Sequence, residues 1–276
     1  RKLVCSESYE SGNSDDHQPA DPRQLAECLA ACPDLEALVI YWDFFRMGPP
    51  DERVGDLLAA IHQHGAGLRR LAIHSNALLV EEGDDRPLLR AESLPDLRRL
   101  ELVRCNRLDA NSVVPILREF PRLTHLDLNY TALGETDGAN EIAHAIGANL
   151  PELQWLSLHR CCHVYDDGVA AIAAGCPELR QAGLGRNYDL TEAALIALGD
   201  HCAKLELVGM YYNNGITRAG LDYLIERCPN FHCFHHGRGW CQIKEIRDLQ
   251  KKYPQICFDG VHPECVQKTS EAANPP

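Results

Sequence analysis

Apolar residues recur in one short pattern along most of the chain. Eight segments follow the pattern L-x-x-L-x-L-x-x-[N/C], with substitutions. Their first apolar positions are spaced by 33, 29, 26, 30, 26, 26 and 26 residues, and they are Leu35, Leu68, Leu97, Leu123, Leu153, Leu179, Leu205 and Phe231. A ninth, weaker copy, PQICFDG, places Ile256 25 residues further on. A nearly fixed period of this length indicates a repeat architecture.

The pattern predicts one strand and one helix in each repeat. Within L-x-L the apolar residues alternate with others, so they share one face of a short strand. The residues that follow carry apolar positions at helical spacing, and Asp109, Thr191 and Thr217 are suitable N-cap residues. One such unit cannot bury its own apolar face, whereas stacked copies can. We therefore expect an α/β fold: a leucine-rich-repeat solenoid shaped as a curved right-handed β/α horseshoe, with a parallel sheet on the concave face and helices on the convex face.

A small polar or cysteine residue stands at the end of most predicted strands. These positions, eight residues after the first apolar one, are Asp43, Asn76, Cys105, Thr131, Cys161, Asn187, Asn213 and Gly239. A turn there leaves backbone groups unpaired inside the stack, and an Asn amide can bond them, with Cys and Thr doing so more weakly. A second series spaced by 26 residues, Cys176, Cys202 and Cys228, falls at helix ends. We expect the cysteines of both series to be buried and structural.

The 26-residue period, the Cys/Asn series and phrases such as LPDLRRLELVRCNRLDANSV and CPELRQAGLGRNYDLTEAAL resemble cysteine-containing leucine-rich repeats. That subtype is typical of F-box/leucine-rich-repeat proteins, the substrate receptors of cullin-type ubiquitin ligases. The resemblance covers most of residues 21–260 and is strongest from Leu94 to Cys228. It implies a solenoid of about eight or nine repeats over 21–260. Residues 1–20 are expected to be the end of an earlier repeat plus a polar loop, with any F-box further upstream, and residues 261–276 to be a flexible tail.

Composition and motif content exclude several classes of function. The formal net charge of −13 disfavours nucleic acid and anionic membranes as partners, and no apolar run is long enough for a membrane span. Thirteen cysteines in a chain that can build a large core favour reduced thiols and a cytoplasmic or nuclear location. No phosphate-binding loop, G-x-S-x-G elbow or His-Glu-x-x-His occurs. We therefore expect a non-catalytic protein without a cofactor.

The concave face is the predicted binding surface, because residues between and just after the inward leucines point into the groove. Exposed aromatic and Arg side chains are typical of protein-binding hot spots. The candidate partner-binding residues are Tyr41, His74, Glu101, Asp127, Asn129, Trp155, His159, Arg186, Tyr211, Tyr212 and His235, with Arg160 flanking them. Gly183 and Gly185 are expected to leave a low spot walled by aromatics. The alternative is that these are exposed strand residues with no partner.

These observations leave two hypotheses for the function. In the first, the chain is the substrate-recognition module of an F-box ubiquitin ligase, which binds a protein substrate and reaches a Skp-type adaptor and a cullin through an upstream region. In the second, it is a stand-alone repeat scaffold, or a structural subunit of a large assembly unrelated to ubiquitin. A small-molecule sensor would lack the basic patch expected for phosphorylated ligands. The 33-residue interval, which carries YWDFFRMGPPDERVG, is either a loop packed on the solenoid edge or a partner-contacting insertion.

One stretch, RCPNFHCFHHGRGWC, has the composition of a zinc site, with three cysteines and three histidines. When the stretch is aligned with the repeat, however, Phe231, Phe234 and His236 take the leucine positions. The other donors, His232, Cys233 and His235, cannot all converge on one metal ion from a single strand. A metal would need help from Cys241, Cys257, His262 or Cys265, and zinc's usual C-x-x-C pair is missing. The stretch is therefore predicted to be the eighth repeat rather than a metal site.

Overall fold

The computed structural model describes residues 2–6, 22–42, 52–75, 88–106, 108–131, 138–213, 215–236 and 243–258. The strands are β1 (Lys2–Ser6), β2 (Ala37–Trp42), β3 (Arg70–Ser75), β4 (Arg99–Val103), β5 (His125–Asp127), β6 (Trp155–Ser157), β7 (Gln181–Gly183), β8 (Leu207–Gly209) and β9 (Cys233–His235). The helices are α1 (Pro22–Ala31), α2 (Glu52–His64), α3 (Ala110–Glu119), α4 (Gly138–Asn149), α5 (Asp166–Gly175), α6 (Glu192–His201), α7 (Arg218–Arg227) and α8 (Ile243–Lys252).

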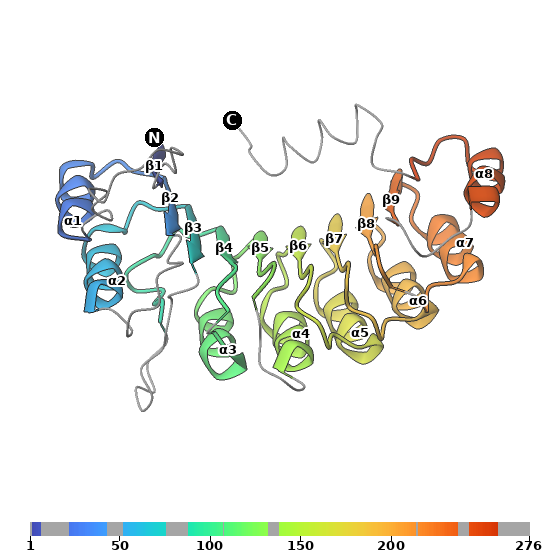
Figure 1. Cartoon of the computed structure of the whole chain (residues 1–276), viewed down its shortest axis with the longest axis horizontal. Coiled ribbons are helices and arrows are strands. Elements are labelled where there is room, and N and C mark those ends of the chain that lie inside the picture. The colour runs from blue at the N-terminus through green and yellow to red at the C-terminus, as the bar shows by residue number, and fades with distance from the viewer. Residues whose placement is uncertain are drawn as a thin grey trace, which may run out of the picture.

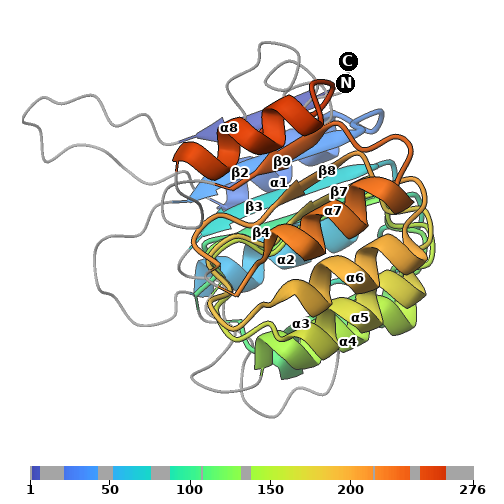
Figure 2. The same ribbon diagram turned by 90° about the vertical axis from the view of Figure 1, so that its right-hand side faces the viewer.

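The described elements form an open solenoid. The nine strands pair in chain order, all parallel, and the resulting sheet follows the inner side of an arc with the helices along its outer side (Figure 1). Seen from the end of the arc, the helices run alongside one another in a second layer (Figure 2). The predicted α/β fold, a leucine-rich-repeat-like solenoid with a concave sheet and convex helices, is confirmed.

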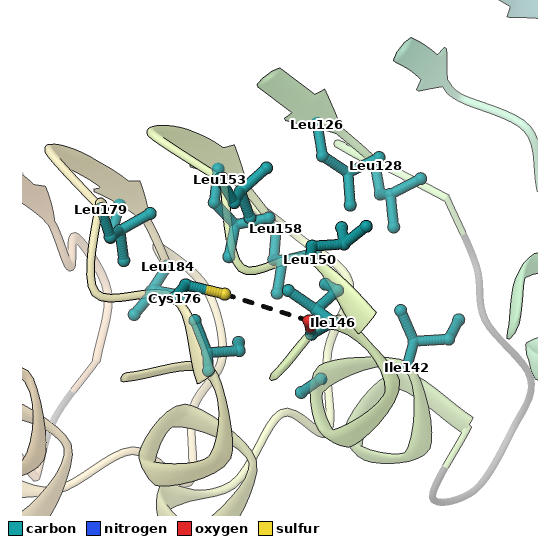
Figure 3. Packing of buried hydrophobic residues seen from close by; sticks show 14 of the residues in the cluster. Leu126, Leu128, Ile142, Ile146, Leu150, Leu153, Leu158, Cys176, Leu179 and Leu184 are labelled. Atoms are coloured by element: carbon teal, nitrogen blue, oxygen red, sulfur yellow. Dashed lines mark hydrogen bonds between the residues drawn. The ribbon is translucent and has the colours of Figure 1, made fainter. Parts of the chain in front are cut away.

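The core lies between the sheet and the helices. Strand pairing places the apolar positions of successive repeats side by side, as in Leu100↔Leu126 and Leu126↔Leu156. Leu126 of β5 and Leu158, which follows β6, lie between the sheet and α4, where Ile142 and Ile146 are fully enclosed (Figure 3). Each repeat thus buries its apolar side chains against its own helix and against both neighbours, which is why stacking stabilises units that could not fold alone.

The residue that ends each strand ties one repeat to the previous one. Five of these residues are fully buried or nearly so, and each donates to a backbone carbonyl about one repeat earlier: Cys105 to Ile73 (3.7 Å), Thr131 to Leu102 (2.7 Å), Cys161 to Leu128 (3.1 Å), Asn187 to Leu158 (3.1 Å) and Asn213 to Leu184 (3.1 Å). Asn213 also accepts from the backbone N–H of Asn187 at 3.2 Å. The predicted role of this series, called the turn ladder below, is confirmed at these positions; Asp43, Asn76 and Gly239 lie outside the described residues.

The helix ends are fixed by the residues the sequence suggested. Asp109, Thr191 and Thr217 cap helices α3, α6 and α7, each accepting a backbone N–H from the first turn. Cys202 and Cys228 end α6 and α7, and the Cys228 thiol donates to the Cys202 carbonyl at 3.4 Å. Burial raises the pKa of the Cys202 thiol to about 12 and that of Cys228 to about 11, so both stay protonated and can donate.

The ends of the solenoid differ from its regular middle. Between β3 and β4, the described residues 88–98 form turns and no helix. At the other end, Phe231, Phe234 and His236 are buried as the repeat register predicted, and Cys257 forms a parallel bridge with Cys233. The segments around YWDFFRMGPPDERVG and the tail 261–276 fall wholly or largely outside the described residues.

Replacing Asn187 by Ala should remove one side-chain amide that donates to two backbone carbonyls, those of Leu158 and Leu184. We expect the free energy of unfolding to fall by about 2–4 kcal/mol, because buried backbone groups lose their partners. Urea denaturation monitored by circular dichroism measures this change. Cys161→Ala is the matched control, with a smaller expected loss because a thiol is a weak donor; an equal loss in both variants would contradict the ranking.

Gly175 is required where α5 crosses closest to α4. A Cβ atom at Gly175 would overlap the backbone carbonyl of Gly147, whereas a Cβ atom at Gly55 in α2 would meet nothing within 4 Å. Gly175→Ala should therefore lower the free energy of unfolding by about 1–3 kcal/mol by overpacking. Gly55→Ala should leave it unchanged or raise it by up to about 1 kcal/mol through helix propensity. Thermal denaturation measures the melting temperature of each variant, which should fall for Gly175→Ala and stay the same or rise for Gly55→Ala. Equal shifts in the two melting temperatures would refute the close approach of Gly175 to the Gly147 carbonyl.

A candidate binding surface on the concave face

The sheet register arranges the concave side chains in rows that cross the strands. The central row is Val39, Ala72, Glu101, Asp127, Ser157, Gly183, Gly209 and His235. Because side chains alternate along a strand, the row two residues earlier lies on the same face. That earlier row contains Arg70, Arg99, His125, Trp155, Gln181, Leu207 and Cys233. The next row, two residues after the central one, holds Tyr41 and His74 and leads to Asn129, His159 and Tyr211.

An ion-pair network occupies the concave face on β3 and β4. The carboxylate of Glu101 accepts from Arg70 Nε at 2.9 Å and from Arg99 Nε at 2.6 Å. Burial alone would raise the pKa of Glu101, but the neighbouring His74 imidazole and the two guanidinium groups hold it at about 2. The Tyr41 ring packs on His74 with centroids 4.5 Å apart. Of these residues the sequence predicted Tyr41, His74 and Glu101; continuing the period-2 alternation backwards along the strand would have found Arg70 and Arg99.

A polar chain continues from this network across β5 and β6. The Asp127 carboxylate accepts from the Asn129 backbone N–H at 2.9 Å. The Asn129 side-chain oxygen in turn accepts from the Ser157 hydroxyl at 2.6 Å and from the His159 backbone N–H at 2.8 Å. Burial raises the pKa of Asp127 to about 6, and the charge of Glu101 acts in the same direction. The predicted residues Asp127 and Asn129 therefore set the geometry of the groove floor.

Gly183 in β7 and Gly185, two residues further on, are covered by two aromatic rings. A Cβ atom on Gly183 would lie 2.6 Å from His159 Nε2, and one on Gly185 would lie 2.6 Å from the Tyr211 ring. His159 and Tyr211 pack together with centroids 4.7 Å apart. The space predicted as a low spot is therefore filled by these rings, because small residues on one strand let side chains of its neighbours lie flat across it.

His159 is held as a neutral hydrogen-bonding group. Its Nδ1 accepts from the Gly185 backbone N–H at 2.9 Å, which leaves the proton on Nε2. Burial lowers the pKa of His159 to about 4, and the nearby His235 acts in the same direction. Burial also lowers the pKa of His235. At neutral pH this part of the groove thus presents uncharged imidazoles beside Tyr211.

A ridge of Arg and Tyr side chains borders the groove where the strands end. Its members are Arg104, Tyr130, Arg160, Arg186 and Tyr212, each immediately before a turn-ladder residue and each at a positive φ between 58° and 62°. We call this set the Arg–Tyr ridge. Left-handed backbone costs a non-glycine residue roughly 1–2 kcal/mol, and it persists because the N–H of a ridge residue bonds the next repeat, as from Arg160 to the Gly185 carbonyl at 3.0 Å.

The sequence predicted only part of this ridge. Arg160, Arg186 and Tyr212 were expected beside the groove, whereas Arg104 and Tyr130 were missed. Their place in the repeat, one residue before Cys105 and Thr131, is the same as that of the predicted residues and would have identified them. Trp155 lies within stacking range of His125, with ring centroids 6.4 Å apart. Tyr41 on β2 and His235 on β9 lie at opposite ends of the sheet and do not share one site.

The described residues offer no metal centre to this surface. Among them, no three His, Cys, Asp or Glu side chains gather closely enough to hold an ion. Cys233, a donor in the cysteine–histidine stretch, is fully buried with Leu207 and packs against Cys257. Cys241, His262 and Cys265 lie outside the described residues. None of the helices in the described part of the chain is both long and apolar enough to cross a membrane.

Comparison with known proteins identifies the fold. No family model and no curated protein sequence matches the chain. Among solved structures, a protein from Bacteroides fragilis matches with a TM-score of 0.51 and 19% identity over 85% of this chain and 64% of that chain. A chain of the complex of Rad7 and Elc1 from yeast matches with a TM-score of 0.50 and 17% identity over 83% of this chain and 66% of that chain. This chain thus spans slightly less than two thirds of either neighbour, and the likeness is one of fold.

Asp127 should make stability depend on pH. Its pKa is raised from 3.8 to about 6 in the folded protein. An acid with a raised pKa favours the folded state at low pH, and this contribution is lost as pH rises from about 4 through about 6. Asp127→Asn keeps the acceptor for Asn129 without the charge. The variant should therefore be more stable than the wild type at pH 7, by about 1–3 kcal/mol, and the difference should vanish near pH 4. Urea denaturation at several pH values measures it, and a constant difference would contradict the assignment.

Proposed function

We propose that this chain is a protein-interaction module that binds a partner in the groove of its concave sheet. The observation that carries the proposal is the set of polar atoms on the groove floor. Gln181 Oε1 and His235 Nε2 are both buried and make no hydrogen bond with the described residues. Buried polar groups in folded proteins are almost always hydrogen-bonded. Turning these two side chains towards a partner laid in the groove would give both atoms hydrogen-bond partners.

The residues around these atoms suit a protein partner. His159 and Tyr211 present aromatic surface fixed by their packing on each other, and Trp155 stacks beside His125, so little side-chain entropy is lost when a partner binds. Aromatic anchors surrounded by polar groups are the usual composition of protein-binding hot spots. A repeat solenoid also places such groups on one continuous face, because every repeat contributes the same register positions.

More specifically, we propose that the module is the substrate-recognition part of an F-box type, cullin-dependent ubiquitin ligase. The resemblance of LPDLRRLELVRC and CPELRQAGLGRN to cysteine-containing repeats supports this assignment. The yeast neighbour, whose structure is that of a complex of Rad7 with Elc1, is a protein of similar fold found with a partner protein. Chemistry would take place on the partner enzymes and not on this chain.

The alternative is a stand-alone repeat scaffold with no link to ubiquitin. It is favoured by the similar likeness, with a TM-score of 0.51, to the Bacteroides fragilis protein. The two proposals share the concave binding face and differ in whether a cullin and a Skp-type adaptor accompany the chain. The partners that co-purify with the protein therefore distinguish them.

Affinity purification of the protein, tagged at its own gene and analysed by quantitative mass spectrometry, tests both levels. We expect a cullin and a Skp-type adaptor with the wild type and with the double variant Trp155→Ala, Tyr211→Ala, and loss of the substrate from the double variant alone. Tyr223→Ala, which removes an aromatic ring from α7 on the convex side, is the matched control and should retain everything. Partners retained in full by the double variant would refute the concave face, whereas a lost partner without any cullin would support the scaffold.

A further inference from the structure

The Arg–Tyr ridge holds its cationic groups in a fixed order. The guanidinium of Arg104 lies 5.6 Å from the centre of the Tyr130 ring, and that of Arg160 lies 5.2 Å from the same ring. Arg186 lies 4.6 Å over the Tyr212 ring. Two tyrosines therefore hold three arginines by cation–π contacts across five consecutive strand ends. The ridge is an ordered line of positive charge rather than a set of free side chains.

These three arginines differ from many of the other basic residues in the described part of the chain, which pair with carboxylates. Examples are Arg180 with Glu206 at 2.6 Å, Lys204 with Glu178 at 2.5 Å, and Arg227 with Asp200 at 3.7 Å. Arg104, Arg160 and Arg186 make no ion pair with any described residue. Arg104 and Arg160 are also exposed, and Arg186 is half-buried. What sets these three apart is their alignment, because three cationic groups without carboxylates at one rim form a local positive surface on a chain with net charge −13.

The backbone adds an independent reason to assign a role to the side chains. All five ridge residues have a positive φ, a conformation that Gly or Asn adopts with less strain. The turn ladder requires that conformation but does not require Arg or Tyr at those positions. Long cationic and aromatic side chains at five successive strained positions are therefore not explained by the backbone conformation alone.

We propose that the Arg–Tyr ridge binds an acidic peptide segment of the partner, laid across the strand ends. The ridge spans four strand spacings, roughly 20 Å, which an extended peptide covers in about six residues. Guanidinium groups bind carboxylates through paired hydrogen bonds, so Asp and Glu side chains of the peptide would complete the ion pairs that this chain omits. The proposal rests on the proposed function, because it names the chemistry of the segment that the concave face recognises.

An acidic peptide fits the molecule better than a nucleic acid, the other ligand that Arg and Tyr side chains recognise. The net charge of −13 repels a long polyanion, and long-range repulsion grows with each added phosphate. The groove next to the ridge also carries the charged network of Glu101 and the carboxyl group of Asp127. A short acidic segment contacts the three arginines while avoiding these groups, whereas a continuous phosphate backbone would not.

Fluorescence polarisation with two labelled octapeptides and one labelled oligonucleotide tests the proposal. The probes are an eight-residue polyglutamate, an eight-residue polyglutamine and an eight-nucleotide oligodeoxyadenylate. The ridge variant is Arg104→Gln, Arg160→Gln, Arg186→Gln. The matched control is Arg180→Gln, Lys204→Gln, Arg227→Gln, which removes the same charge from positions already paired with carboxylates. Circular dichroism establishes that both triple variants remain folded.

We expect polyglutamate to bind the wild type and the control variant alike, to bind the ridge variant at least tenfold more weakly, and to lose affinity as salt is raised. Polyglutamine and the oligonucleotide should bind none of them measurably. Equal polyglutamate affinity in the two triple variants, or no binding to the wild type, would overturn the proposal. Ridge-dependent binding of the oligonucleotide alone would replace it with a nucleic-acid site. If polyglutamate fails while the Trp155, Tyr211 double variant still loses its partner, only the acidic peptide is refuted and the concave binding face stands.

Discussion

The structure depends on one hydrogen-bonding constraint at the end of every strand. There the chain turns from the sheet towards the helix layer inside a stack of repeats, where water cannot satisfy its backbone. The turn ladder solves this problem by sending a small polar side chain to a carbonyl about one repeat earlier, as Asn187 does to Leu158 at 3.1 Å. Since each bond joins two repeats, every repeat is stabilised by its neighbours. The same turn forces the preceding residue into the left-handed conformation and so creates the positions of the Arg–Tyr ridge.

The concave face combines two surfaces of different character. Its floor is a polar and aromatic layer fixed by contacts between repeats, such as Asn129 with Ser157 at 2.6 Å and His159 with the Gly185 backbone at 2.9 Å. Its rim is the line of cationic groups held on tyrosine rings. Contacts between repeats order the floor without a partner, which lowers the entropy cost of association. In the proposed role, the rim supplies the charge that steers an acidic segment into place. The division of roles follows from the repeat, because floor and rim occupy fixed register positions.

The sequence predicted the fold almost completely because the fold follows from periodicity. The repeated pattern predicted the pairing of Leu126 with Leu156 across a 30-residue interval, the turn-ladder role of Cys161 and the caps at Thr191 and Thr217. The binding face was predicted as a surface but not in its contacts. Where the His159 ring lies depends on side-chain rotamers and on the absence of Cβ atoms in β7, and a linear pattern does not encode either. Arg104 and Tyr130 were missed because apolar patterning does not mark the residue before each ladder position.

Site-specific photo-crosslinking tests most directly whether a partner occupies the concave face. A photoreactive phenylalanine analogue placed at Tyr211, in the groove, is compared with one placed at Tyr223, on the convex α7, in the protein purified from its native cells. We expect a crosslinked partner from position 211, suppressed by excess polyglutamate, and none from position 223. A partner crosslinked from position 223 and not from position 211 would contradict it.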